Sequence, residues 1–472
     1  MKDRPVLLLL TSSWISMLGA ALVTLAGLSW LFALPLNIRG SGVNNPYIGL
    51  LLFIAIPIVF FAGLVLIPIG IALARHKVTQ NLDEIENRRI AWRRAGIFFG
   101  VMTVVNVVIA SQLSYRAVEH MDTNQFCGQT CHVMKPEFTA HGAEPPHQAL
   151  ACADCHIAPG ATGWLKAKTA GTAQLFAVMF NTFPRPIESA MENDKLVSSA
   201  VTCEQCHQRD TPIAPRLVVI PSYKDDVTNT RTVTVLLMHI GGGALGGIHA
   251  AHLGPGVRIR YATSDKKRQT IPWVEYKNTK SGASRTYLAT GSTADSVRSL
   301  ATFEMQCVDC HNRAAHAFEL PERAVNQAMA AGQIAAGLPF VEKEAVELLK
   351  TSYSSNAEAA EKIPEAFSSF YLQRYPDAAA KQGAAIQAAG QTLTTIYERN
   401  VFPDLKVTWG TYPNSLGHTD APGCFRCHDE GHSTADKKTI SQDCGLCHQA
   451  VAVDEAAPDI LKTLELNPTQ NH

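Results

Sequence analysis

The sequence lacks a net charge, because 41 lysine and arginine side chains match 41 aspartate and glutamate side chains. A chain without excess positive charge has no general attraction to nucleic acid, so partners have to be inferred from local features. Charge is also absent from three long segments near the N-terminus, and cysteine is absent from everything before residue 127. These absences divide the chain into an apolar first part and a polar remainder that carries every cysteine.

The three uncharged segments are long enough to cross a membrane. They cover residues 6–34, 47–74 and 95–115, and about 20 apolar residues span a hydrocarbon core about 30 Å thick. We predict three transmembrane helices. A cleaved secretory signal is the alternative for the first segment, but its apolar run is longer than that of a signal, and no small-residue cleavage site stands out after it.

The basic residues between these segments predict the orientation. Six lysines and arginines lie between the second and third segments, whereas the first connection contains only Arg39. Because basic loops stay in the cytoplasm, we expect a cytoplasmic N-terminus and delivery of everything after Arg116 across the membrane. In a bacterium this places the protein in the inner (cytoplasmic) membrane, with its cysteine-rich part in the periplasm.

The cysteines follow one pattern. All 12 occur in six pairs, and a histidine directly follows the second cysteine of each pair. Five pairs have the spacing CxxCH, and the first has one more residue, CxxxCH. With 17 histidines in the chain, chance does not explain six such placements, so the pattern has a chemical cause. The motifs are Cys127, Cys131 and His132; Cys152, Cys155 and His156; Cys203, Cys206 and His207; Cys307, Cys310 and His311; Cys424, Cys427 and His428; and Cys444, Cys447 and His448.

Covalently bound haem c explains this pattern. The two cysteines form thioethers with the porphyrin, and the adjacent histidine reaches the iron from the same side. A disulfide framework gives no reason for the histidines, and zinc sites need convergent pairs without a histidine beside each one. We therefore predict six haems, the first at the CxxxCH motif, where the extra residue can bulge outward and a disulfide is the main alternative.

Eleven histidines lie outside the motifs and offer second axial ligands. Iron with histidine on both faces passes electrons with little rearrangement. Met134 could instead serve the first haem, or pack against the porphyrin. Because no histidine lies within the predicted spans, we do not expect a transmembrane haem b. The preferred histidines are His141, His147, His249, His252, His316, His418 and His432, with His120 and His239 as weaker candidates.

The predicted fold is three N-terminal transmembrane α-helices followed by a periplasmic multihaem cytochrome c domain of helices and loops around stacked haems. Alternating β-branched segments between residues 217 and 300 predict a small β-rich insert. Apolar positions recurring at three and four residues predict helices between 320 and 400. The expected divisions are a membrane anchor (1–116), haems one to three (117–216), the insert (217–300), haem four with helices (301–400), a two-haem module (401–450) and a tail (451–472).

Residues 93 to 320 resemble the NapC/NirT/NrfH family of membrane-anchored multihaem quinol dehydrogenases. The matching features are an apolar helix that runs into the first motif, Met134 beside it, PEFTAH with His141, the next three motifs, and CVDCHNRAAH with His316. The resemblance implies that the first haem lies at the membrane surface and takes electrons from menaquinol or ubiquinol.

The chain also departs from this family. It has two additional N-terminal helices, the longer first motif, the β-rich insert and two additional haem motifs. In the family a lysine and a nearby carboxylate after the second motif belong to the quinol pocket. Lys166 and Lys168 match the lysine, but Gln174 stands where the acid is expected. The alternative for both lysines is contact with phospholipid headgroups.

The favoured function is quinol oxidation at the periplasmic membrane surface, followed by electron transfer along the haems to a periplasmic or membrane redox partner. Asp122, Glu137 and Asp154 are candidate proton acceptors. One alternative is a relay subunit of a larger respiratory complex, in which the extra helices dock a separate quinol-oxidising protein. Another is a terminal reductase, which is not favoured because histidines suffice to close every iron.

Overall fold

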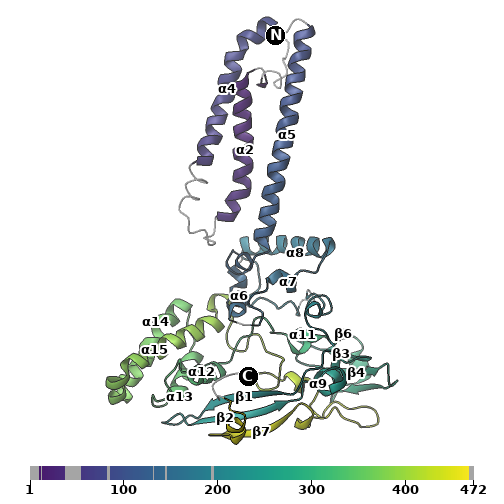
Figure 1. The fold of residues 1–472 in the computed structure, drawn as a ribbon, viewed down its shortest axis with the longest axis vertical. Coiled ribbons are helices and arrows are strands. Elements are labelled where there is room, and N and C mark those ends of the chain that lie inside the picture. Colours follow the sequence, from purple (N-terminus) through teal and green to yellow (C-terminus); the bar gives the residue numbers. More distant parts are fainter. Residues whose placement is uncertain are drawn as a thin grey trace. The chain divides into compact units, whose positions relative to one another are not determined.

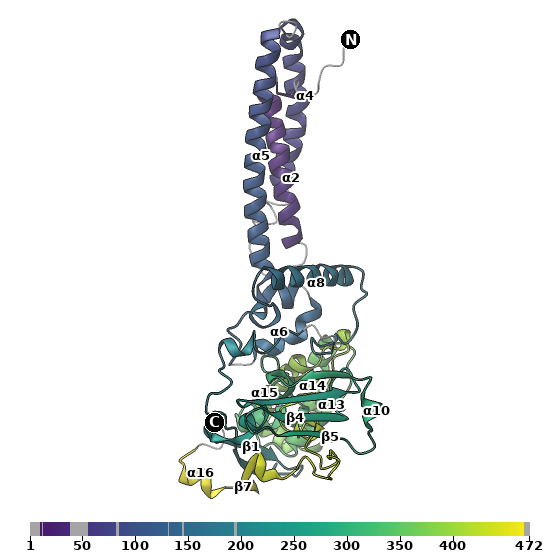
Figure 2. The same cartoon turned by 90° about the vertical axis from the view of Figure 1, so that its right-hand side faces the viewer.

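The computed structural model describes residues 10–11, 13–37, 55–81, 85–130, 132–143, 146–192 and 196–466. The chain forms two compact units, Met1–His132 and Val133–His472 (Figures 1 and 2). The first 9 residues, the connection that contains Arg39, Cys131 and the last six residues lie outside the described part. The units divide the chain at residue 132, and the six-part division expected from the sequence stays a prediction.

The first unit contains three long helices: α2 (Trp14–Asn37), α4 (Ile56–Asn81) and α5 (Ile85–Met121). Two segments are long and apolar enough to cross a membrane, Ile56–Leu73 and Arg89–Met121, and Trp14–Ser29 forms a shorter apolar helix. The helices therefore agree with two of the predicted spans. The first span, whose start lies outside the described residues, stays a prediction. A short π-helical turn, η2 (Phe126–Thr130), follows α5.

Glycines allow α2 and α4 to approach closely. A Cβ atom added at Gly19 would lie 2.7 Å from the Gly63 carbonyl oxygen, and one added at Gly70 would lie 2.3 Å from the Ser16 backbone nitrogen. Real side chains do not fit at such distances, so both glycines are needed for this packing. Close contact between small residues is how helices associate where no hydrophobic effect drives them together.

The second unit begins with short helices joined by loops. After the 3₁₀ turn η3 (His132–Met134) come α6 (Lys135–Gly142), α7 (Cys152–His156), α8 (Ala161–Met179) and the 3₁₀ turn η4 (Cys203–Gln205). None of the described residues of α7 is buried by protein atoms. A segment with little core of its own fits the expectation that cofactors fill the space between these elements.

Two antiparallel sheets follow. The alternating segments predicted as strands form β2, β3 and β4, and each of these strands buries part of its side chains in a core. The first sheet has the order β1-β2-β7 and the second β5-β4-β3-β6, so strand β7, from the C-terminal end of the chain, completes the first sheet. The strands are β1 (Arg216–Tyr223), β2 (Arg231–Met238), β3 (Val257–Thr263), β4 (Trp273–Asn278), β5 (Ser284–Leu288), β6 (Ala301–Glu304) and β7 (His448–Glu455).

Short helical elements connect the strands. The glycine-rich segment forms the 3₁₀ turn η5 (Gly243–Leu245) and helix α9 (Gly247–Leu253), which carries two of the candidate ligands. Helices α10 (Ala294–Val297) and α11 (Cys307–Cys310) lie on either side of β6. The glycine-rich segment thus presents histidines from a helix and not from a phosphate-binding loop.

The predicted helical region contains the largest hydrophobic core. Its helices are amphipathic, and they bury side chains such as Leu349, Phe367, Tyr371 and Leu393 against one another. The amide of Asn229, at the β1–β2 turn, donates to the carbonyl oxygens of Ala336 and Leu338 and joins the first sheet to this bundle. The helices are α12 (Pro321–Ala330), α13 (Val341–Lys350), α14 (Asn356–Arg374) and α15 (Pro376–Asn400) (Figure 1).

The C-terminal part is made of turns. It contains the 3₁₀ turns η6 (Pro403–Leu405), η7 (Gly423–Arg426) and η8 (Cys444–Leu446), then strand β7 and helix α16 (Asp459–Thr463). Its last two cysteine motifs lie on η7 and η8.

Candidate haem-binding sites

We number the six motifs site 1 to site 6 in chain order. In sites 2 to 6 the two cysteines are brought together by one helical turn. In sites 3, 4 and 5 the backbone N–H of the motif histidine donates to the carbonyl of the first cysteine, at 2.8, 2.8 and 3.1 Å. A single turn places residues i, i+3 and i+4 on one side, which is the side a porphyrin edge would occupy. None of the eleven cysteines among the described residues forms a disulfide.

Some motif cysteines are exposed to solvent, and Cys206 of site 3 is one of them. Cys206 is exposed, whereas Cys203 of the same motif is half-buried. The Cys206 backbone N–H donates to the Cys203 carbonyl at 3.2 Å, so Cys206 stays within the motif turn. Because the chain leaves Cys206 exposed, a porphyrin bound at this motif would be the group that covers its sulfur atom. The haem-binding role of Cys206 stays a prediction. The other exposed motif cysteines are Cys155, Cys424 and Cys444.

Each motif histidine of sites 2 to 6 faces a histidine from elsewhere in the chain. The distances between ring centres lie within a narrow range. They are 6.3 Å for His156 and His316 (site 2), 6.2 Å for His207 and His147 (site 3), 6.2 Å for His311 and His249 (site 4), 5.8 Å for His428 and His252 (site 5), and 6.2 Å for His448 and His418 (site 6).

This spacing fits one iron ion between the two rings. Two imidazoles that bind a metal ion from opposite sides, each nitrogen about 2 Å from the ion, have ring centres about 6 Å apart. Zinc fits less well, because the described residues contain no cluster of three or more His, Cys, Asp and Glu side chains able to hold a metal. The pairs therefore suit a planar cofactor that supplies its own four equatorial ligands.

Hydrogen bonds orient several of these rings. Nδ1 of His147, His252 and His428 lies 2.9, 2.8 and 2.7 Å from a backbone carbonyl oxygen, of Ala314, Ile248 and Ser441 respectively. A metal-binding histidine commonly donates one ring N–H to such a carbonyl. This leaves Nε2 of each ring free to face its partner ring.

The environment of site 2 favours neutral imidazoles. Burial lowers the pKa of His316 to about 3, where nearby Arg313 acts in the same direction, and partial desolvation by the surrounding protein lowers the pKa of His156. A neutral imidazole is the form that binds a metal.

His432 differs from the paired histidines in its hydrogen bonds. Its ring nitrogens lie 2.8 Å from an Asp429 carboxylate oxygen and 2.6 Å from the carbonyl oxygen of Ile271. Both nitrogens are engaged, which favours a buried structural residue, and the ligand role of His432 stays a prediction. Sequence spacing did not distinguish it from His418, because the Ile271 carbonyl comes from a distant segment.

The other predicted ligands pair with none of the motif histidine side chains that the structure describes. His141 is buried on α6 near His316. The backbone N–H of His239 donates to the Cys447 carbonyl at 2.8 Å. His120 packs edge-on against Phe126 at 5.7 Å. At site 1, Cys131 and the His132 side chain lie outside the described residues, so the ligand set of that site, Met134 included, stays a prediction.

Neighbouring sites in the chain are also neighbours in the structure. Partial burial raises the pKa of Cys155, and the nearby thiol of Cys203 has the next largest effect in the same direction. Since this effect requires the two thiols to be close, site 2 lies beside site 3. The Gln306 side chain accepts from the Ser199 backbone N–H at 2.9 Å and joins the segments that precede sites 3 and 4. Burial and then the thiol of Cys424 raise the pKa of Cys447, which places site 5 beside site 6.

Sites 4 and 5 are joined by a network that sequence reasoning missed. Arg426, inside the site 5 motif, donates to the carbonyl oxygen of Asp309, inside the site 4 motif, at 2.6 Å. The Asp309 carboxylate accepts from the Tyr261 hydroxyl and lies 3.4 Å from Arg268. Arginine and aspartate at the variable positions of CxxCH carry no signal of this contact, because Tyr261 and Arg268 come from the second sheet and the loop that follows β3.

The candidate quinol residues lie on α8. Lys166 and Lys168 share this helix with large apolar side chains that the second unit leaves exposed, and the Lys168 ammonium lies 5.8 Å from the Trp164 ring centre. The quinol role of both lysines stays a prediction, as does the effect of Gln174. The exposed apolar side chains on and beside this helix are Trp164, Leu165, Phe176, Met179 and Phe180.

Among the candidate proton acceptors, Glu137 stands out. Burial raises the pKa of its carboxyl group, against the opposing effect of Arg313. Asp154 accepts from the Ala151 backbone N–H at 2.9 Å, a helix-capping contact. The Asp122 backbone N–H donates to the Val118 carbonyl at 3.1 Å. The proton-accepting role of all three stays a prediction.

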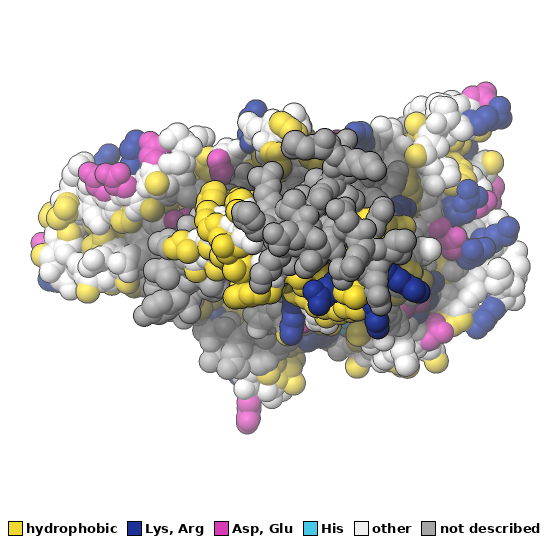
Figure 3. Space-filling model, turned by 90° about the horizontal axis from the view of Figure 1, so that it is seen from above, with side chains coloured by type: hydrophobic (Ala, Val, Ile, Leu, Met, Phe, Trp, Pro, Cys, Tyr) yellow, Lys and Arg dark blue, Asp and Glu magenta, His cyan; other side chains and the backbone are white. Residues whose placement is uncertain are grey.

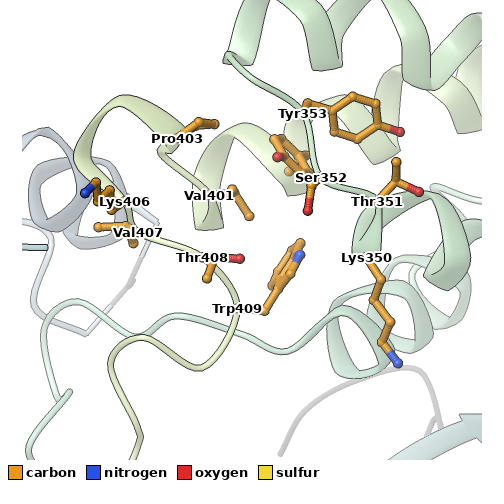
Figure 4. Close-up of a pocket in the computed structure, with 11 residues that line it drawn as sticks. Lys350, Thr351, Ser352, Tyr353, Val401, Pro403, Lys406, Val407, Thr408 and Trp409 are labelled. Atoms are coloured by element: carbon orange, nitrogen blue, oxygen red, sulfur yellow. The ribbon is translucent and has the colours of Figure 1, made fainter. Parts of the chain in front are cut away.

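A cavity of about 290 Å³ lies elsewhere in the second unit. It is lined by residues that include Lys350, Tyr353, Lys406 and Trp409, with Trp409 between Thr351 and Thr408 (Figure 4). No predicted site residue lines it, so it gives the proposed quinol chemistry no support.

Comparisons with known proteins agree with the motifs. Residues 90–216 match the N-terminal region of the NapC/NirT cytochrome c family. The chain is 37% identical over 425 residues to the cytochrome c-type protein ImcH of Geobacter sulfurreducens, and the match covers 87% of this chain and 82% of that protein. No solved structure matches the chain. Members of the family are membrane-anchored electron-transfer proteins that exchange electrons with quinol and with redox partners. The chain therefore belongs to the NapC/NirT family and is a c-type cytochrome, a protein with covalently bound haem c.

Proposed function

We propose that this chain is a hexahaem cytochrome of the bacterial cytoplasmic membrane that oxidises quinol at the periplasmic surface and passes the electrons to a redox partner. The observation that supports this most strongly is the set of five histidine pairs at one-metal spacing. Bound haem supplies one-electron chemistry, and the chain supplies axial ligands, burial and spacing.

The proposed ligand set follows from the geometry. The motif cysteines hold the porphyrins, and the five described histidine pairs close both faces of the irons at sites 2 to 6. An iron with two protein ligands has no open position for a substrate, which disfavours a terminal reductase. At site 1, Cys127, Cys131 and His132 would hold the sixth haem, with Met134 or His141 as the candidate second ligand.

Quinol oxidation is assigned to α8, with site 1 as the first electron acceptor. The exposed apolar side chains of α8, with lysines among them, suit a membrane interface, where apolar groups enter the lipid and lysines reach headgroups or a quinol oxygen. Hydrophobic side chains and basic side chains also lie side by side in the view of Figure 3. Two protons and two electrons leave each quinol, and Asp122, Glu137 and Asp154 are the candidate proton acceptors.

The test is anaerobic mixing of the purified full-length chain with a reduced menaquinol analogue, followed at the haem c α-band. We expect prompt reduction that a quinol-site inhibitor blocks. Lys166→Ala or Lys168→Ala should slow it by about tenfold or more if the lysine assists proton transfer. Lys381→Ala, an exposed lysine on α15, is the control and should leave the rate unchanged.

Two results would overturn the proposal in different ways. If dithionite reduces the haems and quinol does not, the chain is a relay subunit whose donor is a separate protein. If quinol reduces the lysine variants at the wild-type rate, the lysines contact lipid and the quinol site lies elsewhere.

A further inference from the structure

Arg426 lies between two of the proposed haem sites and contacts both. It sits between the cysteines of site 5, and its three guanidinium nitrogens all donate to backbone carbonyls. Nε donates to Gly423 at 2.8 Å, one terminal nitrogen to Arg268 at 2.9 Å, and the other to Asp309 of site 4 at 2.6 Å. These bonds fix the guanidinium in one position, because all its nitrogens are engaged.

The guanidinium charge acts on both sites. Cys310, the second cysteine of site 4, and Cys427, the second cysteine of site 5, are half-buried, and Arg426 exerts the largest charge effect on each thiol. The two cysteines also act on one another. The cation therefore lies where the thioether edges of two neighbouring porphyrins would meet.

The three acceptors of Arg426 are backbone carbonyl oxygens, which carry no net charge. The buried carboxylate of Asp309 pairs with Arg268 at 3.4 Å, and their side chains are 4% and 11% exposed. Asp429, the other carboxylate that acts on Cys427, is engaged with His432 at 2.8 Å and is 39% exposed. A fixed positive charge in a water-poor site stabilises the reduced iron, which carries one positive charge less.

We propose that Arg426 is a shared positioning residue of sites 4 and 5 that holds the two motifs side by side and raises the reduction potentials of both haems. The inference rests on the proposed hexahaem function. The step served is transfer of one electron from ferrous iron at site 4 to ferric iron at site 5, and no bond or proton changes place. The electrons originate from quinol oxidation. Arg426 thereby connects the C-terminal two-haem module to site 4.

The test is a spectroscopic redox titration of the full-length protein and of three variants, Arg426→Gln, Arg426→Lys and Arg258→Gln. Arg426→Gln should lower the reduction equilibrium constant of two haems by about tenfold, or about 59 mV for a one-electron couple. Arg426→Lys keeps the charge and should restore most of the potential, while losing the bond to Asp309. Arg258→Gln, which removes an exposed arginine that pairs with Glu304 at 3.2 Å, should change nothing.

The haem content of each protein, measured as the pyridine haemochrome, separates the two proposals. Fewer than six haems in the wild-type protein would overturn the hexahaem function itself. Six haems with unchanged potentials in Arg426→Gln would overturn the role of Arg426 alone. If Arg426→Gln does not fold, Arg268→Gln replaces it, because it removes the second buried cation and should lower the same two potentials. Unchanged potentials in that variant would equally contradict the inference.

Discussion

At the scale of single residues, the partners of the two ring nitrogens decide what a histidine can do. His418 faces the motif histidine of site 6 at 6.2 Å. His432, fourteen residues later in the same turn-rich segment, is 2% exposed and has a partner for each nitrogen. A ring with one free nitrogen can bind iron, whereas a ring with two engaged nitrogens stabilises the fold.

Substituting these two histidines should therefore have different effects. His418→Ala should convert about one haem of six to the high-spin state, because the site 6 iron loses an axial ligand. His432→Ala should leave all haems low-spin and lower the free energy of unfolding by about 1–3 kcal/mol, because Asp429 and the Ile271 carbonyl lose their partner. Electron paramagnetic resonance and thermal unfolding measure the two effects. A high-spin signal in His432→Ala would show that this residue is a ligand.

At the scale of elements, the helical turns of the motifs and the glycine contact between α2 and α4 depend on different kinds of interaction. The motif turns need only local hydrogen bonds, so they form wherever the sequence places CxxCH. The contact between α2 and α4 instead depends on distant glycines whose Cβ positions are blocked by the opposite helix. A larger side chain there has to separate the helices.

We expect Gly63→Leu to destabilise the first unit by about 1–3 kcal/mol, a typical cost of overpacking, because a Cβ added at Gly63 would lie 2.8 Å from the Gly19 carbonyl oxygen. The matched control is Gly100→Leu on α5, where an added Cβ meets nothing within 4 Å. Thermal unfolding of both variants in the same detergent, followed by circular dichroism, measures the difference. Equal stability of the two variants would show that α2 and α4 do not depend on this contact.

At the scale of the whole molecule, the sites follow one another in space as they do in the chain. Site 2 lies beside site 3, site 4 beside site 5, and site 5 beside site 6. The last site lies at the start of β7, an outer strand of the first sheet. Under the proposed function, this order predicts that the terminal site receives electrons from site 5 and donates them to the redox partner.

Removing the terminal site should therefore leave the upstream haems competent. Cys444→Ser combined with Cys447→Ser should reduce the haem content from six to five, and quinol should reduce the remaining five at the wild-type rate. Stopped-flow absorbance at the α-band measures this. A rate at least about tenfold lower would place site 6 upstream, between quinol and the other haems.

Much of the chemistry is local and was predicted from the sequence. Cysteine, cysteine and histidine within five residues specify a haem attachment site without knowledge of the fold, and the alternating segments predicted β2, β3 and β4. Apolar length alone predicted two helices that can cross a membrane. These features depend on contacts within one turn, one strand or one uninterrupted apolar run.

The tertiary structure alone decided which histidine faces which. His316 stands five residues after the site 4 motif histidine, yet it faces the motif histidine of site 2. Arg426 and Asp309 occupy the variable positions of two motifs and meet only because sites 4 and 5 fold against each other. Sequence spacing specifies the residues available for a site. Which of them meet depends on the packing of segments that are far apart in the chain, because a second ligand needs only to be near in space.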